Sequence, residues 1–194
     1  SNYAPTGVPE ITGELIEGSV LQVNTDLIDD PDGLGSFTYQ WQKQVNDVWL
    51  DIEGAAEHSF TPDDNEVDHS LRAFVEYEDG RGNKEKIYSL PTDVIENVND
   101  NPDGTVTIIG IASEGQFFMA THDLTDEDGL GTVSWQWSAN GTVLPGATSD
   151  EYWLSQDDVG DVFTVTASYV DGEGTAESVT SAPTSVVSNE NDFP

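Results

Sequence analysis

Apolar and polar residues alternate along most of the chain, most clearly in residues 36–43, where Phe37, Tyr39 and Trp41 share one face. A period of two is what a half-buried antiparallel strand requires. The same reading predicts strands over 10–13 and 19–25, and a short strand ending near Phe60. It also predicts a long strand carrying Leu71, Ala73, Val75 and Tyr77, and a closing strand over 89–95.

The whole pattern occurs a second time about a hundred residues later. Gly7, Ile11, Gly13, Glu17, Gly18, Asp26 and Leu27 recur as Gly104, Ile108, Gly110, Glu114, Gly115, Asp123 and Leu124. We place a one-residue slip of the register at Pro31 and a four-residue slip in the loop after Trp41. The second copy then repeats the strands, with Val133, Trp135 and Trp137 on one face, a tight turn at Asn140-Gly141 and a closing strand over 181–187. The same Asn-Gly-Thr stretch also fits an N-glycosylation acceptor.

This repetition predicts an all-β chain of two domains, residues 1–100 and 101–194, joined by a linker over 97–104. Seven short strands per copy, with a Trp on the third and a Tyr on the sixth, are typical of a cadherin- or immunoglobulin-type β-sandwich. The chain has no cysteine, so the disulfide of antibody domains is missing. Packing of aromatic side chains then has to stabilise the core, at about 2 to 3 kcal/mol for each buried ring.

The net charge is −33, from 38 acidic residues against five basic ones, all of which lie between residues 43 and 86. Such a charge disfavours nucleic acid and anionic membrane as partners. No apolar run is long enough to cross a bilayer, and no leader-like segment opens the chain. The lack of cysteine fits either a reducing compartment or a secreted domain that is stabilised by metal instead.

The linker carries the oxygen ligands that Ca²⁺ prefers, together with Pro102 and Gly104. In a sandwich, acidic loops from the facing ends of both copies converge on such a linker. Two carboxylates about 4 Å apart repel by about 1 kcal/mol in water and about 4 kcal/mol near a protein surface, so a cation has to offset them. The predicted Ca²⁺ ligands are Glu17, Asp29, Asp30, Asp32, Asp64, Asn97, Asn99, Asp100, Asp103, Asp126, Glu127, Asp128 and Asp171.

Weaker partial sites are expected at the two ends of the chain, the last of them formed by Glu114, Asp157, Asp158, Asn191 and Asp192. Mg²⁺ suits these ligands less well because it demands octahedral order. Pro102 stands where an EF-hand needs Gly, so the linker is not an EF-hand. For any single acid, an ordinary solvated turn remains open as the alternative.

Catalytic signatures are absent from the sequence. His58, His69 and His122 share no metal-ligand spacing, and no nucleophile elbow, phosphate loop or zinc-protease motif occurs. We therefore expect no enzymatic activity. Trp49 and Trp153 lie near loop edges and leave open a second function, a carbohydrate-binding sandwich.

Several motifs of the second copy carry a family resemblance: residues 128–131, 135–137, 146–149, 158–160, 169–174 and 175–183. The chain resembles the tandem immunoglobulin-like repeats of giant calcium-dependent RTX-type bacterial adhesins, and its linker resembles, more loosely, a cadherin junction. The first copy departs from the pattern at residues 66–68 and 83–90.

The resemblance implies an extender module of a secreted or cell-surface bacterial adhesin, rigidified by interdomain Ca²⁺ and supporting cell adhesion or biofilm attachment. It implies neighbouring repeats of the same chain as the partners. We expect a monomer, with no nucleic-acid partner and no membrane insertion.

Overall fold

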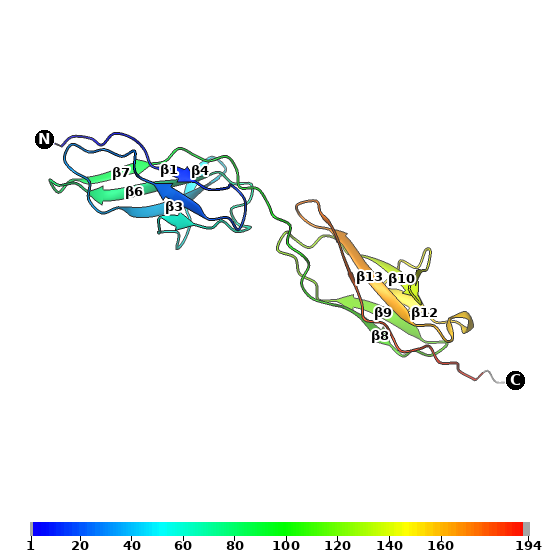
Figure 1. Ribbon diagram of the computed structural model, residues 1–194. Coiled ribbons are helices and arrows are strands. Elements are labelled where there is room, and N and C mark those ends of the chain that lie inside the picture. Colours follow the sequence, from blue (N-terminus) through cyan, green and yellow to red (C-terminus); the bar gives the residue numbers. More distant parts are fainter. Residues whose placement is uncertain (1, 192–194) are drawn as a thin grey trace. The chain divides into compact units, whose positions relative to one another are not determined.

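The computed structural model describes residues 2–191, which fall into two compact units, Ser1–Val98 and Asn99–Pro194. Both units consist of antiparallel β-strands (Figure 1), apart from one short 3₁₀ turn at Gln156–Asp158. The all-β prediction is confirmed. No helix among residues 2–191 has the length and apolar character needed to span a bilayer.

From residue 2 onward, the first unit contains seven strands in two sheets. They are β1 (Glu10–Thr12), β2 (Leu21–Asn24), β3 (Thr38–Val45), β4 (Val48–Asp51), β5 (Ser59–Phe60), β6 (Leu71–Glu78) and β7 (Lys84–Tyr88). One sheet has the order β1-β2-β5 and the other β4-β3-β6-β7.

The second unit repeats this plan with its own seven strands. They are β8 (Val106–Gly110), β9 (Phe117–His122), β10 (Ser134–Ala139), β11 (Thr142–Val143), β12 (Glu151–Trp153), β13 (Phe163–Val170) and β14 (Ala176–Thr180). The sheet orders are β12-β9-β8 and β11-β10-β13-β14. Asn140 and Gly141 both have positive φ between β10 and β11, so the predicted tight turn is confirmed.

Each unit packs its two sheets around one tryptophan. Trp41 and Trp137 are completely buried. Their indole N–H groups donate to main-chain carbonyls, Trp41 to Glu57 at 3.0 Å and Trp137 to Ser149 at 2.8 Å. The predicted inward residues of β6 also lie in the core, because alternate side chains of a strand point to the same face.

The closing strand is predicted in the wrong place. Instead of 89–95 and 181–187, the strands that pair with β6 and β13 are β7 and β14, directly after the last hairpin. The segment that follows holds a proline, Pro91 or Pro183, which has no N–H to donate to a ladder. In the first unit the segment follows β6 through single main-chain bonds, from the Ser89 and Thr92 N–H groups to the carbonyls of Ala73 and Leu71, and through isolated bridges such as Ser70 with Val94.

The repeat register is also wrong at one point. Matching identical residues aligned Leu27 with Leu124, with the slip at Pro31. In the structure, Leu27 is 58% exposed, whereas Ile28 and Leu124 are each 4% exposed. Ile28 is therefore the equivalent of Leu124, and the extra residue of the first copy lies before Leu27.

Candidate metal sites

Each unit has two acidic clusters, one at each of its ends. We call the end where the chain enters a unit its upstream end, and the end where the chain leaves it the downstream end. The upstream cluster comes from the loop before β3 or β10 and from the last hairpin. The downstream cluster comes from the connection after β1 or β8 and from the segment before β6 or β13.

The upstream cluster of the first unit is built on three buried aspartates, Asp30, Asp32 and Asp79. Asp30 accepts hydrogen bonds from the Tyr77 hydroxyl at 2.6 Å and from the Asp32 N–H at 2.8 Å. The Gly80 N–H donates to the Asp32 carbonyl at 3.0 Å, which docks the last hairpin on the loop. Burial, followed by the bond to Asp30, raises the pKa of the Tyr77 hydroxyl well above its ordinary value.

A cationic side chain neutralises this first cluster. The Nε of Arg81 lies 2.8 Å from Oδ1 of Asp32, whose side chain is fully buried. The contact meets the distance of an ion pair, though not the directionality of a hydrogen bond. The other carboxylate oxygen of Asp32 accepts the Tyr3 N–H at 2.7 Å. The side-chain amide of Asn83 donates a hydrogen bond to Oδ2 of Asp79 at 2.8 Å. This bond keeps the pKa of Asp79 below its ordinary value.

The upstream cluster of the second unit is arranged in the same way. Asp126, Asp128 and Asp171 take the places of Asp30, Asp32 and Asp79. Asp126 accepts the Tyr169 hydroxyl and the Asp128 N–H. The Gly172 N–H donates to the Asp128 carbonyl at 2.9 Å. Oδ2 of Asp128 accepts the Asp100 N–H at 2.7 Å, as Asp32 accepts that of Tyr3.

The chain segment that enters each unit is held by a second repeated contact. The side-chain amide of Asn2 donates to Glu85 at 2.7 Å, and that of Asn99 donates to Glu177 at 2.9 Å. Asn99 was predicted as a metal ligand, whereas the glutamates were missed. The signal for them was present, because both follow the repeated Asp-Gly of the last hairpin at the same spacing.

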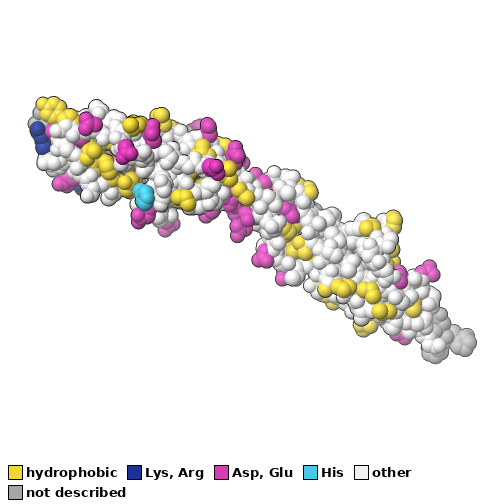
Figure 2. Space-filling model, in the orientation of Figure 1, with side chains coloured by type: hydrophobic (Ala, Val, Ile, Leu, Met, Phe, Trp, Pro, Cys, Tyr) yellow, Lys and Arg dark blue, Asp and Glu magenta, His cyan; other side chains and the backbone are white. Residues whose placement is uncertain are grey.

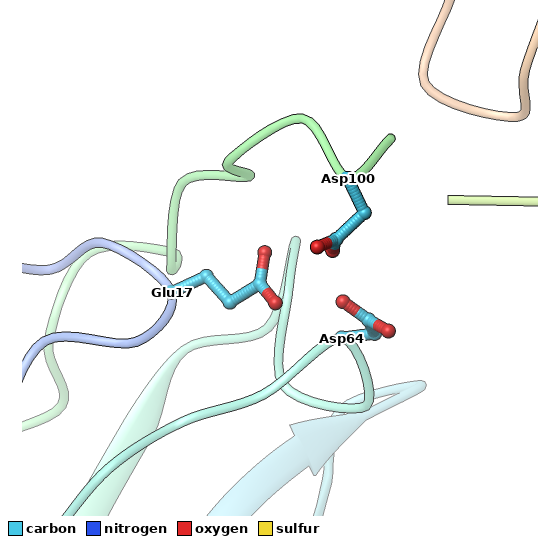
Figure 3. Close-up of side chains that lie close together, drawn as sticks. All are labelled: Glu17, Asp64 and Asp100. Carbon is cyan, nitrogen blue, oxygen red and sulfur yellow. The ribbon is translucent and has the colours of Figure 1, made fainter. Parts of the chain in front are cut away.

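The downstream cluster of the first unit contains Glu17, Asp64 and Glu66. A carboxylate oxygen of Glu17 lies within 4.8 Å of one of Asp64; Figure 3 shows both side chains, and it also labels Asp100, which belongs to the second unit. Oε2 of Glu17 accepts the Val98 N–H at 3.2 Å. Glu66 is buried and forms an ion pair with Lys43 at 3.1 Å.

The downstream cluster of the second unit repeats the exit contact with fewer charges. Oε2 of Glu114 accepts the Glu190 N–H at 3.3 Å. Gln156 takes the place of Asp64, and Asp158, in the place of Glu66, accepts hydrogen bonds from Ser155 and Tyr152. Burial and the contact with Asp158 raise the pKa of Tyr152 to about 12. Of the remaining predicted ligands here, Asp192 lies outside the described residues.

Four predicted ligands lie away from these hydrogen-bonded clusters or at their margin. Asp29 is exposed and bonds through its main chain to Thr6, and its equivalent in the second unit is Thr125. Glu127 and Asp103 are exposed, and Asp103 accepts the N–H of Gly104. Asn97 is half-buried and lies beside Val98.

The acidic ends fit a hard divalent cation. Oδ1 of Asp64 and Oδ2 of Asp171 are buried and have no hydrogen-bond partner among residues 2–191. A buried carboxylate oxygen left without a partner is costly, and oxygen atoms of this kind are the ligands that Ca²⁺ takes, six to eight at a time. The second unit contains no Lys or Arg that could pair with Asp171. Figure 2 shows Asp and Glu side chains on the surfaces of both units.

No protein-family model and no curated protein matches the chain. A solved structure of a Ca²⁺-stabilised adhesin that helps an Antarctic bacterium reach out and bind ice is similar to it at 15% identity. The match covers 97% of this chain and 50% of that one, with a TM-score of 0.36. The chain thus spans half the length of that structure, and a TM-score at this level does not establish a shared fold.

Proposed function

We propose that the chain is a pair of consecutive extender modules, each an immunoglobulin-like sandwich, from a large adhesin on a bacterial surface. Ca²⁺ bound at the linker fixes the angle between the modules. The partners are neighbouring repeats of the same chain, and the pair is monomeric and has no catalytic role. Its mechanism is mechanical, since stiffening a string of modules holds a distal binding domain away from the cell.

The observation that carries this proposal is that both units hold the chain in the same way where it enters and where it leaves. At the upstream end an asparagine side chain donates to a glutamate, and the main-chain N–H of the following residue donates to an aspartate. The donors are Asn2 and Tyr3 in the first unit, and Asn99 and Asp100 in the second. At the downstream end a glutamate accepts an N–H, Glu17 from Val98 or Glu114 from Glu190. A unit whose two ends are built alike in both copies can be joined to further copies without new contacts, as an array of repeats needs.

The linker is held by these contacts on both sides of one peptide bond. Val98 is bound to Glu17 within the first unit, and Asn99 and Asp100 are bound to Glu177 and Asp128 within the second. Because successive Cα atoms are about 3.8 Å apart, the chain itself keeps these carboxylates near the same short segment. Their mutual repulsion favours a shared divalent cation, and Ca²⁺ tolerates the irregular geometry that such a segment offers.

Calcium titration of the intact chain tests this proposal. We expect Ca²⁺ to bind, and Mg²⁺ to bind at least ten times more weakly, because Mg²⁺ demands octahedral order. Glu17→Gln should weaken Ca²⁺ binding at least tenfold, while Glu10→Gln, an exposed acid on β1, serves as the matched control for the lost charge. A chain that binds no Ca²⁺, or a Glu17→Gln variant that binds as the control does, would contradict the proposal.

A carbohydrate-binding module remains the second candidate, favoured by one exposed aromatic pair. Trp153 is 66% exposed and lies 5.3 Å from the ring of Phe117, which is 37% exposed. Trp49 is less available, because the guanidinium of Arg72 covers its ring at 4.4 Å. Glycan-array binding that is lost in Trp153→Ala and kept in Trp49→Ala would favour this second function.

A further inference from the structure

The upstream ends of the two units differ first in the presence of a built-in cation. In the first unit, Arg81 lies on Asp32 at 2.8 Å. The equivalent position in the second unit, two residues after the Asp of the repeated Asp-Gly turn, is Glu173. At the same place the two units therefore carry opposite charges beside otherwise equivalent buried aspartates.

A second exchange accompanies the first. Asn83, which satisfies Oδ2 of Asp79 in the first unit, is replaced in the second by Thr175, whose N–H donates only to Oδ1 of Asp171. Oδ2 of Asp171 is left buried and without a hydrogen-bond partner among the described residues. Asp171 itself is 7% exposed.

The equivalent acids of the two units are buried to a similar extent. Asp79 and Asp32 are 5% and 9% exposed, and Asp171 and Asp128 are 7% and 9% exposed. The hairpin docks on the loop through the same main-chain bond in both cases, from Gly80 to Asp32 and from Gly172 to Asp128. The main-chain scaffold is thus the same, and the two units differ in the side chains that serve the buried acids, Arg81 and Asn83 in the first unit against Glu173 and Thr175 in the second.

We propose that Arg81 is a built-in substitute for a divalent cation, so that the upstream end of the first unit binds no Ca²⁺ while the equivalent end of the second unit does. This inference rests on the proposed function for the identity of the ion. The guanidinium supplies positive charge to Asp32, and the side-chain amide of Asn83 supplies a donor to Asp79. In the second unit a Ca²⁺ held by Asp128 and Asp171 supplies both, since Glu173 adds to the negative charge.

The functional consequence is a difference in calcium dependence along the array. A junction that is neutralised by arginine keeps its acids paired when Ca²⁺ is withdrawn. A junction that is neutralised by Ca²⁺ loses its cation and loosens. The segment that enters the first unit, at Asn2 and Tyr3, would then stay ordered in chelator, while the segment at Asn99 and Asp100 would not.

An exchange of these residues in the intact chain tests the inference, with the number of bound Ca²⁺ ions measured by calorimetry. Glu173→Arg should bind one ion fewer than the wild type. Glu173→Gln, the control that removes the acid without adding a cation, should keep the wild-type number. The reciprocal variant, Arg81→Glu combined with Asn83→Thr, should bind one ion more.

The outcomes separate this inference from the proposed function. If the wild type binds Ca²⁺ and Glu173→Arg leaves the number of ions unchanged, the inference is overturned and the proposed function stands. If Glu173→Arg binds one ion fewer while Glu17→Gln binds Ca²⁺ as its control Glu10→Gln does, the inference stands and the proposed function falls. A wild type that binds no Ca²⁺ overturns both, because the inference places one ion at the upstream end of the second unit. Should the reciprocal variant fail to fold, the Glu173→Arg comparison decides alone.

Discussion

Asp123 shows how a single carboxylate fixes the start of the second unit. Its Oδ1 accepts the Thr105 N–H at 2.6 Å and the Thr105 hydroxyl at 3.0 Å. These two bonds, main-chain bond first, hold the pKa of Asp123 below its ordinary value. The equivalent residue of the first unit is the exposed Leu27, so this bond to the start of the first strand belongs to the second unit alone.

We predict that the stabilising effect of Asp123 disappears on acidification. A carboxyl whose pKa is lower in the folded state stabilises the fold above its unfolded pKa, here about 3.8, and the effect is lost as the pH falls through the folded value. The free energy of unfolding of wild type minus Asp123→Asn, measured by urea denaturation in chelator, should therefore shrink between pH 5 and pH 2. Glu10→Gln controls for the removal of one charge. A difference that stays constant over this range would show that the residue acts only through the geometry that Asn preserves.

At this scale the sequence predicts core residues better than site residues. Trp41 and Trp137 were placed correctly, because alternation alone sends them inward. Matching identical residues failed at Leu27, where burial, not identity, decides which residue is equivalent to Leu124. The contact between Arg81 and Asp32 could not be predicted, since it joins residues that are far apart in the chain and depends on how the hairpin docks.

In each unit, one glycine allows the loop before the third strand to pass close to the main chain of the long strand, β6 or β13. A Cβ on Gly131 would lie 1.9 Å from the carbonyl oxygen of Val170 in β13, and one on Gly35 would lie 2.0 Å from that of Glu78 in β6. Both glycines belong to the repeated Asp-Gly-Leu-Gly stretch. The last glycine of this motif, which contributes to the family resemblance, is therefore required for the loop to pack against the long strand.

We predict that Gly131→Ala destabilises the second unit by more than about 2 kcal/mol, since the clash is with main chain that cannot rotate away. The control is Gly146→Ala, where φ is +81° and no atom lies within 4 Å of the added Cβ. That change should cost only about 1 to 2 kcal/mol of left-handed strain. The free energies of unfolding of both variants, from urea titration, decide the matter. Equal losses would mean that the approach of the loop to β13 contributes nothing.

Elements as a whole were predicted well except at the last strand. Periodicity of two identifies a strand but not its hydrogen-bond partner, and neither residues 84–88 nor residues 89–95 show a clear alternation of apolar and polar side chains. Hairpin geometry decides between them, because β7 follows its turn directly and pairs with β6 from Glu78 onward. The proline that follows then ends the ladder.

For the whole molecule, the dominant physical quantity is a charge of −33 with every Lys and Arg before residue 87. The second unit has no Lys or Arg with which to neutralise its acids. The sequence predicted the repetition, which the equal strand orders of the two units confirm; the linker bounds and the bound Ca²⁺ stay predictions. The sequence could not show which acids are buried, nor that each unit binds the chain through the same two contacts.

Spin-label distance measurements between the two units test the central claim, that Ca²⁺ fixes the linker. The chain has no cysteine, so Val48→Cys and Val143→Cys, 56% and 55% exposed in the hairpins of the two units, place one label on each. We predict a narrow distance distribution in Ca²⁺ and a distribution at least twice as wide in chelator. Equal widths in the two conditions would contradict the account.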